Sequence, residues 1–168
     1  MKRFLATGVL ALCLMTSQIA RAAEDQQAKT KAAMVAKYQL VKEAYENANV
    51  EDVEAELAPN FKVKLSNKQT LNRAQFVAMQ RNFLNAVTKV HQVTLRINKV
   101  TVTSNRAVVV VTQYYDFELT DARGRPHRLK ESSVARDTWV RVSGRWKNSY
   151  SEFLSGTATL DGKKITKG

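Results

Sequence analysis

The chain has 168 residues and a formal net charge of +12, with 27 basic and 15 acidic residues. This length suits one domain of ordinary size. The excess of basic residues favours contact with an anionic surface. However, these residues are scattered and do not alternate with aromatic residues on one element, so we expect no specific nucleic-acid binding.

The first 22 residues have the three parts of a Sec-type signal peptide. Two basic residues precede a short apolar run, Phe4–Met15, and Ala20-Arg21-Ala22 offers a cleavage site after Ala22. The run is shorter than the roughly 20 residues of a membrane-spanning helix, although an uncleaved anchor remains an alternative. We therefore expect a periplasmic or secreted protein with a net charge of +9. Loss of Cys13 with the signal would exclude disulfides, thiolate metal sites and cysteine nucleophiles.

Three helices are predicted in the first half of the chain. The first, over residues 24–48, has an apolar stripe with helical spacing: Met34, Tyr38, Val41, Tyr45 and Ala48. Asn49 is suited to cap a short second helix that ends before Pro59. Asn72 caps a third helix, whose expected buried face consists of Phe76, Gln80, Phe83, Leu84 and Val87.

Alternating apolar residues predict strands in the remainder of the chain. A short strand includes Phe61, Val63 and Leu65, and longer strands begin at His91 and Ala107, followed by strands near 128–142 and 145–154. Ser143-Gly144 predicts the tight turn between the last two. This order indicates one α+β domain over residues 23–155, with a curved antiparallel sheet and the N-terminal helices packed on one face. Residues 156–168 are predicted to be a flexible C-terminal tail.

The chain resembles the nuclear transport factor 2-like superfamily, in its small bacterial SnoaL-like and domain-of-unknown-function branches. The resemblance covers roughly residues 30 to 154. The segments that carry it are Ala44-Tyr45-Glu46-Asn47-Ala48-Asn49-Val50-Glu51-Asp52-Val53-Glu54-Ala55, Leu57-Ala58-Pro59-Asn60-Phe61, Arg106-Ala107-Val108-Val109-Val110, Asp137-Thr138-Trp139-Val140-Arg141 and Gly144-Arg145-Trp146.

The resemblance implies a conical fold that encloses an apolar pocket, frequently in a homodimer packed through the sheets. Its members include isomerases, dehydratases, epoxide hydrolases and cyclases, and also proteins without a known reaction, so the fold does not determine the function. For the ligand pocket we expect Tyr38, Tyr45, Phe83, Tyr115, Phe117, Asp137 and Trp139.

No complete catalytic set can be assembled from the sequence. The resemblance implies that the base of an isomerase of this family would fall near Leu65 or Ser66, and the pocket acid near Val134 or Ala135. None of these residues carries a carboxylate. The candidate catalytic residues are Asp137 and His91, which could form a pair for general acid–base chemistry. The alternative for Asp137 is a cross-strand ion pair with Arg128 or Arg141. No metal site is expected, because the two histidines lack metal-ligand spacing.

We therefore expect an exported protein, without a cofactor, that binds a small apolar or amphipathic ligand or a protein partner. One alternative is a lyase, isomerase or hydrolase acting on a small apolar substrate in the pocket. Another is an accessory subunit of an envelope complex that contacts an anionic surface through its basic face. A homodimer is expected in each case.

Overall fold

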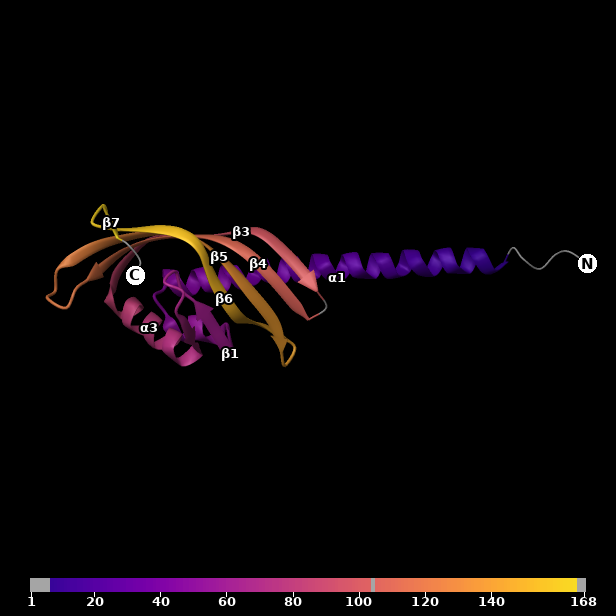
Figure 1. The fold of residues 1–168 in the computed structure, drawn as a ribbon, viewed down its shortest axis with the longest axis horizontal. Helices are drawn as coiled ribbons and strands as arrows, with labels where there is room; N and C mark the ends of the chain where they lie inside the picture. Colours follow the sequence, from indigo (N-terminus) through magenta and orange to yellow (C-terminus); the bar gives the residue numbers. More distant parts are fainter. Residues whose placement is uncertain (1–6, 104, 166–168) are drawn as a thin grey trace, which may run out of the picture.

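The computed structural model describes residues 7–103 and 105–165, with side chains from residue 24 onward. A curved sheet arches over the helices, which lie on its concave side (Figure 1). In chain order the elements are α1 (Thr7–Glu46), α2 (Val50–Ala55), β1 (Leu57–Lys64), β2 (Thr70–Asn72), α3 (Arg73–Ala86), β3 (Val87–Thr103), β4 (Arg106–Thr120), β5 (Pro126–Val142), β6 (Arg145–Leu160) and β7 (Lys163–Ile165). The α+β class with helices on one face is confirmed.

The sheet has the strand order β2-β1-β6-β5-β4-β3, and β7 pairs with β6. Consecutive strands from β3 to β6 form antiparallel pairs. β1 pairs with β6 in parallel, so the sheet is mixed, and the expectation of a purely antiparallel sheet is wrong at this position. Parallel pairing is available here because five elements separate the two strands along the chain, whereas a hairpin would impose the antiparallel direction.

Both predicted asparagine caps are present. Asn49 accepts hydrogen bonds from the backbone N–H groups of Glu51 and Asp52 at the start of α2. Asn72 and Gln75 form a reciprocal capping box at the start of α3. These bonds satisfy N–H groups that have no partner within the helix, and so they fix where each helix begins.

The hairpin between β5 and β6 turns on two residues, as predicted. Ser143 and Gly144 have φ values of 49° and 77°. Two consecutive positive φ values define the tight turn whose twist matches that of the flanking strands. The turn fixes the register in which β5 pairs with β6.

The segment after Gly156, expected to be a flexible tail, instead continues the sheet. β6 runs to Leu160 and then pairs with β7. Gly156 passes so close to β5 that a Cβ atom there would lie 2.6 Å from the carbonyl oxygen of Ser132. This glycine therefore permits close strand contact and does not end the strand. Residues 166–168 of the predicted tail lie outside the described residues.

The buried side chains form two clusters. One joins α2, β1 and α3 around Phe61 and Leu84. The other joins α1 to the sheet around Met34, Val109 and Trp139. The cavity described below is lined by residues of both clusters, so it lies where they meet.

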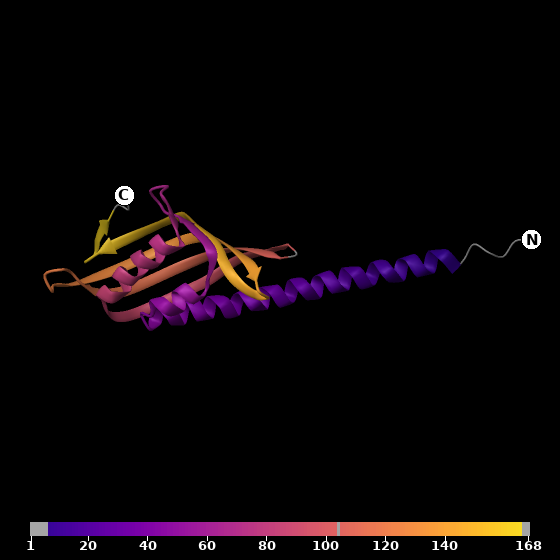
Figure 2. The same cartoon turned by 90° about the horizontal axis from the view of Figure 1, so that it is seen from below.

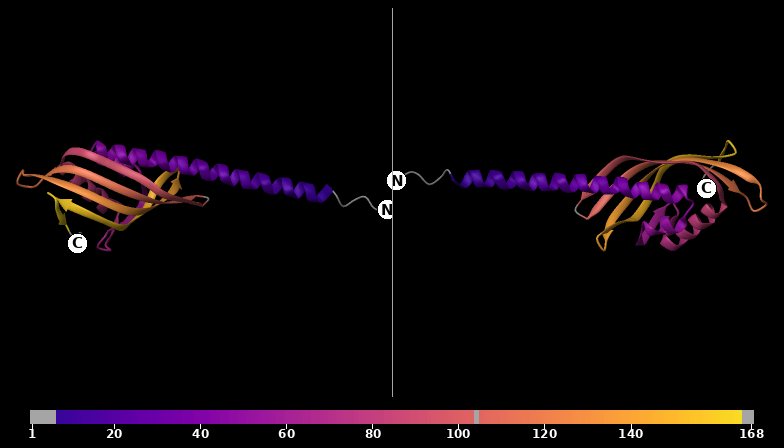
Figure 3. Two further views of the ribbon diagram at one scale, coloured as in Figure 1. Left: turned by 90° about the horizontal axis from the view of Figure 1, so that it is seen from above. Right: turned by 180° about the vertical axis from the view of Figure 1, so that it is seen from behind.

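Helix α1 begins at Thr7, before the predicted start at residue 24, and its N-terminal part extends beyond the sheet (Figures 2 and 3). The predicted signal peptide lies partly outside the described residues. Among the described helices, none combines the length and apolarity needed to cross a membrane.

Candidate functional site

A cavity of about 520 Å³ lies between the concave face of the sheet and the helices. Side chains alternate along a strand, so every second residue of β5 reaches the same face. The cavity is lined in this way by Leu129, Glu131, Ser133, Ala135, Asp137 and Trp139. The other walls come from α1, α2, β1, α3, β4 and β6.

The seven residues that the sequence suggests for a ligand pocket all line this cavity: Tyr38, Tyr45, Phe83, Tyr115, Phe117, Asp137 and Trp139. They come from α1, α3, β4 and β5, which are far apart in the chain. Helical spacing on α1 and strand alternation on β4 and β5 direct them to one space.

Asp137 is the buried polar centre of the cavity wall, with 4% of its surface exposed. Its carboxylate accepts a hydrogen bond from the Tyr38 hydroxyl at 2.5 Å and another from the Ser151 hydroxyl at 2.6 Å. Trp139 Nε1 donates to the same Tyr38 oxygen at 3.4 Å. These donors orient the carboxylate and offset part of the cost of burying it.

Burial changes the ionisation of both partners in the Tyr38–Asp137 pair. Burial raises the pKa of Asp137, while the hydrogen bonds from Ser151, Tyr38 and Asn148 oppose this shift. Burial, followed by the negative charge of Asp137, holds the pKa of Tyr38 well above its ordinary value. Tyr38 is therefore a neutral hydrogen-bond donor, and Asp137 is an acid that can hold or release a proton within an apolar site.

The ion pairs suggested for Asp137 from sequence are not formed. Arg128 instead binds both oxygens of Asp116, at 2.8 and 2.9 Å. The Arg141 guanidinium lies over the ring of Trp146, 4.8 Å from its centre. Within the described chain, no basic side chain forms an ion pair with Asp137.

His91 does not approach Asp137, so the proposed catalytic pair of these residues is wrong. A register shift in β3 between Val90 and Gln92 interrupts the alternation of side chains. Val90 and Val93 pair with inward-facing residues of β4, while His91 contacts Glu118 with 2.9 Å between Nε2 and Oε1. The alternation of apolar residues in the sequence does not reveal this bulge, so the direction of the His91 side chain could not be predicted from it.

Aromatic rings form a continuous wall on one side of the cavity. The ring centres of Tyr45 and Tyr115 are 5.2 Å apart, and Tyr115 stacks on Phe117 at 5.7 Å. Phe83 meets Phe117 edge-on at 5.5 Å. The Tyr45 hydroxyl donates to Gln80 at 3.1 Å, so its polar end is satisfied while its ring faces the cavity.

Sequence reasoning missed several polar residues of the site. Leu65, Ser66 and Ala135 line the cavity without a carboxylate, as expected, and the buried acid in the wall is Asp137, which was expected in the pocket. Ser151 was missed because its role follows from its pairing opposite Asp137 in the β5–β6 register. Glu131 has the same strand parity as Asp137, and this signal could have identified it.

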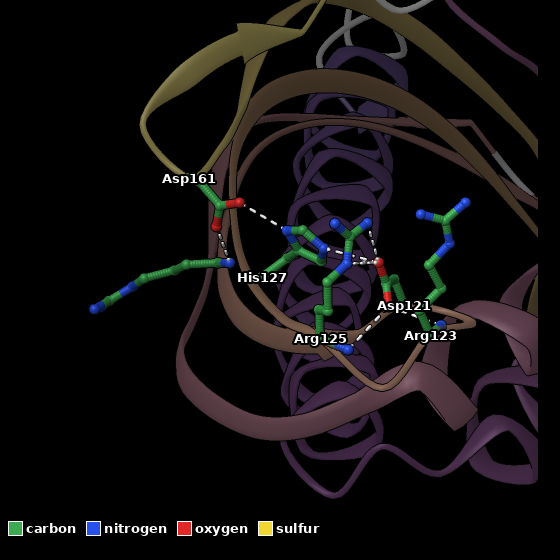
Figure 4. Close-up of polar contacts among 6 residues, drawn as sticks. Asp121, Arg123, Arg125, His127 and Asp161 are labelled. Atoms are coloured by element: carbon green, nitrogen blue, oxygen red, sulfur yellow. Dashed lines mark hydrogen bonds and ion pairs between the residues drawn. The ribbon is translucent and has the colours of Figure 1, made fainter.

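A second polar cluster lies at the turn between β4 and β5 (Figure 4), and its residues are not among those that line the cavity. His127 Nδ1 is 2.7 Å from an oxygen of Asp161, and His127 Nε2 is 3.3 Å from an oxygen of Asp121. Asp121 also accepts from Arg125, whose hydrogen bonds lower the pKa of Asp121 to about 2. Together these contacts tie the β4–β5 turn to the β6–β7 turn. No group of three or more His, Cys, Asp or Glu side chains in the described chain is arranged to hold a metal ion.

The His127 cluster predicts a pH-dependent contribution to stability. Its hydrogen bonds with Asp161 and Asp121 raise the pKa of His127 above the ordinary 6.5. The contribution is therefore fully present below about pH 6.5 and is lost as the pH rises through the raised pKa. His127→Gln should destabilise the protein more at acidic than at alkaline pH, as measured by thermal unfolding between about pH 5 and pH 9.

The Asp161→Asn background provides the control for this prediction. Asp161 has a positive φ of 52°, which asparagine tolerates, so the turn should be preserved. His127→Gln should then have a smaller effect than in the unmodified protein, because one partner is already missing. Equal, pH-independent effects in both backgrounds would show that the cluster does not contribute through ionisation.

Comparisons with known proteins establish the fold. No protein-family model and no curated protein matches the chain. Among solved structures, a conserved protein from Planctomyces limnophilus has a TM-score of 0.65 at 11% identity, covering 79% of this chain and 98% of its own. A candidate dehydratase of the NTF2-like family from Streptomyces avermitilis has a TM-score of 0.60 at 14% identity. The match covers 75% of this chain and 95% of the dehydratase chain. An NTF2-like protein from Cytophaga hutchinsonii has a TM-score of 0.58 at 14% identity. The match covers 74% of this chain and 97% of the Cytophaga chain.

These similarities define the class: an α+β domain with the nuclear transport factor 2-like cone fold, as its sequence resemblance implied. Identities this low show the fold and not the activity.

Proposed function

We propose that this protein binds a small amphipathic molecule in its cavity, with an apolar body against the aromatic wall and a polar group at Asp137. The observation that carries this proposal is the buried carboxylate of Asp137, held by Tyr38 and Ser151 at the wall of a cavity of about 520 Å³. Cavities that bind small molecules combine mostly apolar walls with a few placed polar groups.

The proposal is tested by calorimetric titration with octan-1-ol, a neutral probe with an apolar chain and one hydroxyl. Ala135 is buried and lines the cavity, so Ala135→Phe should fill part of the space and weaken binding by at least about tenfold. Val35→Phe is the control, because Val35 is 61% exposed on α1 and should leave binding unchanged. Equal binding by both variants would place the probe outside the cavity and refute the proposal.

A second candidate function is catalysis of proton transfer, favoured by the Tyr38–Asp137 pair. A buried acid beside a neutral phenol could accept a proton from a substrate while the phenol stabilises developing negative charge. Conversion of a bound molecule to a product of different mass or retention time, abolished by Asp137→Asn, would support it. Unchanged conversion by that variant would exclude this role for Asp137.

We also propose that the protein is exported and forms a homodimer through the outer face of the sheet. That face has partly exposed apolar residues on three strands, among them Val108 and Val110 on β4, Val134 on β5 and Leu154 on β6. Covering such a face would remove apolar surface from water. Light scattering at micromolar concentration should give the mass of a dimer, and Val110→Asp should give a monomer. A monomeric unmodified protein would contradict this proposal.

A further inference from the structure

We infer that the cavity selects an organic cation, an ammonium group carried on a small apolar body, over neutral and anionic molecules of the same shape. This inference rests on the proposed function and specifies its ligand class. It is opposite to the expectation from the whole chain, because a net charge of +12 would favour anionic ligands.

The first argument is the charge of the cavity itself. The acidic and basic side chains that line the cavity are three acids, Glu56, Glu131 and Asp137, and one base, Lys64. Lys64 is neutralised by Glu152, with 3.1 Å between nitrogen and oxygen, and Glu56 is neutralised by Lys37 at 2.7 Å. Lys64 and Lys37 are thus already paired, and an anionic ligand would find no unpaired basic residue among the described residues that line the cavity.

The second argument is the state of Asp137. Its carboxylate accepts hydrogen bonds from Tyr38, Ser151 and Asn148, while a carboxylate can accept about four. All three donors are neutral, so the negative charge has hydrogen bonds but no countercharge. An ammonium group at this position would supply both a countercharge and further donors, whereas a ligand carboxylate would bring a second negative charge into the site.

The third argument is the aromatic wall. Ring faces attract cations, most strongly where water is excluded. Tyr115 pairs in register with Glu131 on the neighbouring strand, and both line the cavity. Burial, followed by the negative charge of Glu131, raises the pKa of Tyr45. Glu131 and Asp137 thus place two acidic residues of β5 beside the aromatic wall.

The test compares three probes that share an apolar chain and differ in charge: octylammonium, octan-1-ol and octanoate. Each is titrated calorimetrically at neutral pH, below the micelle concentration of the two ionic probes and below the solubility limit of octan-1-ol. Octylammonium should bind at least about tenfold more tightly than octan-1-ol, and octanoate should bind more weakly than octan-1-ol. Asp137→Asn should reduce the preference for octylammonium over octan-1-ol to less than about threefold.

Asp116→Asn is the matched control. Asp116 is as buried as Asp137, at 4% exposure, but it is paired with Arg128 and does not line the cavity. This variant should keep the full preference for octylammonium, and circular dichroism should show that both variants are folded.

The outcomes separate the inference from the function on which it rests. Equal binding of the three probes, blocked by Ala135→Phe, would overturn the cation preference and leave the proposed binding function standing. A preference for octylammonium that Asp137→Asn does not change would also overturn it. Binding of none of the probes would refute the proposed function, and the cation preference with it.

Discussion

Trp139→Ala is expected to lower the free energy of unfolding by about 3–5 kcal/mol, the range for truncating a large buried aromatic side chain. Trp139 is 1% exposed and packs edge-on against Tyr38, with 5.7 Å between ring centres. Removing the indole would lose this contact and the hydrogen bond to the Tyr38 hydroxyl. It would also enlarge the cavity, because Trp139 forms part of its wall. Chemical denaturation measures the change.

Two further variants provide reference values for the effect of Trp139→Ala on the free energy of unfolding. Val35→Ala removes an exposed apolar side chain and should change the free energy of unfolding by no more than about 0.5 kcal/mol. Trp139→Phe keeps most of the ring and should lie between the two. If Trp139→Ala cost no more than Val35→Ala, the packing of β5 against α1 described above would be incorrect.

Asp137→Asn is expected to remove a pH-dependent cost of folding. Because burial raises the pKa of Asp137 in the folded protein, its contribution to stability is fully present below its ordinary value of 3.8 and is lost as the pH rises through the raised value. The unmodified protein should therefore lose stability relative to Asp137→Asn over this window. The largest slope for one group is about 1.4 kcal/mol per pH unit.

Denaturant unfolding of the two proteins at a series of pH values from about 4 to 8 measures this difference. Asp25→Asn provides the control, because Asp25 is an exposed residue near the start of the domain and its substitution should leave the pH profile unchanged. A constant difference between Asp137→Asn and the unmodified protein would show that Asp137 keeps an ordinary pKa, and the apolar character assigned to its site would be wrong.

Features determined by neighbouring residues could be predicted from the sequence. The caps at Asn49 and Asn72 and the turn at Ser143-Gly144 depend on a few adjacent residues, and all are present. Strand alternation also placed Tyr115, Phe117 and Asp137 on faces that line one cavity. In each case a local rule determines the result.

Features determined by register or by distant contacts could not be predicted. Tyr38 and Asp137 are separated by 99 positions, and no local pattern indicates that their side chains meet. The shift at Val90 turned His91 away from the cavity, and close packing at Gly156 kept the last residues of β6 in the sheet. The parallel pairing of β1 with β6 likewise depends on the path of the whole chain.

Native mass spectrometry of the protein recovered from its own cells tests the central claim most directly. The cavity and its buried carboxylate predict that the protein carries one small molecule per chain, and that Ala135→Phe is recovered without it while Val35→Phe retains it. A retained molecule with a basic nitrogen would match the charge of the cavity. Recovery of the unmodified protein empty, together with no binding of octan-1-ol or octylammonium in solution, would contradict the account.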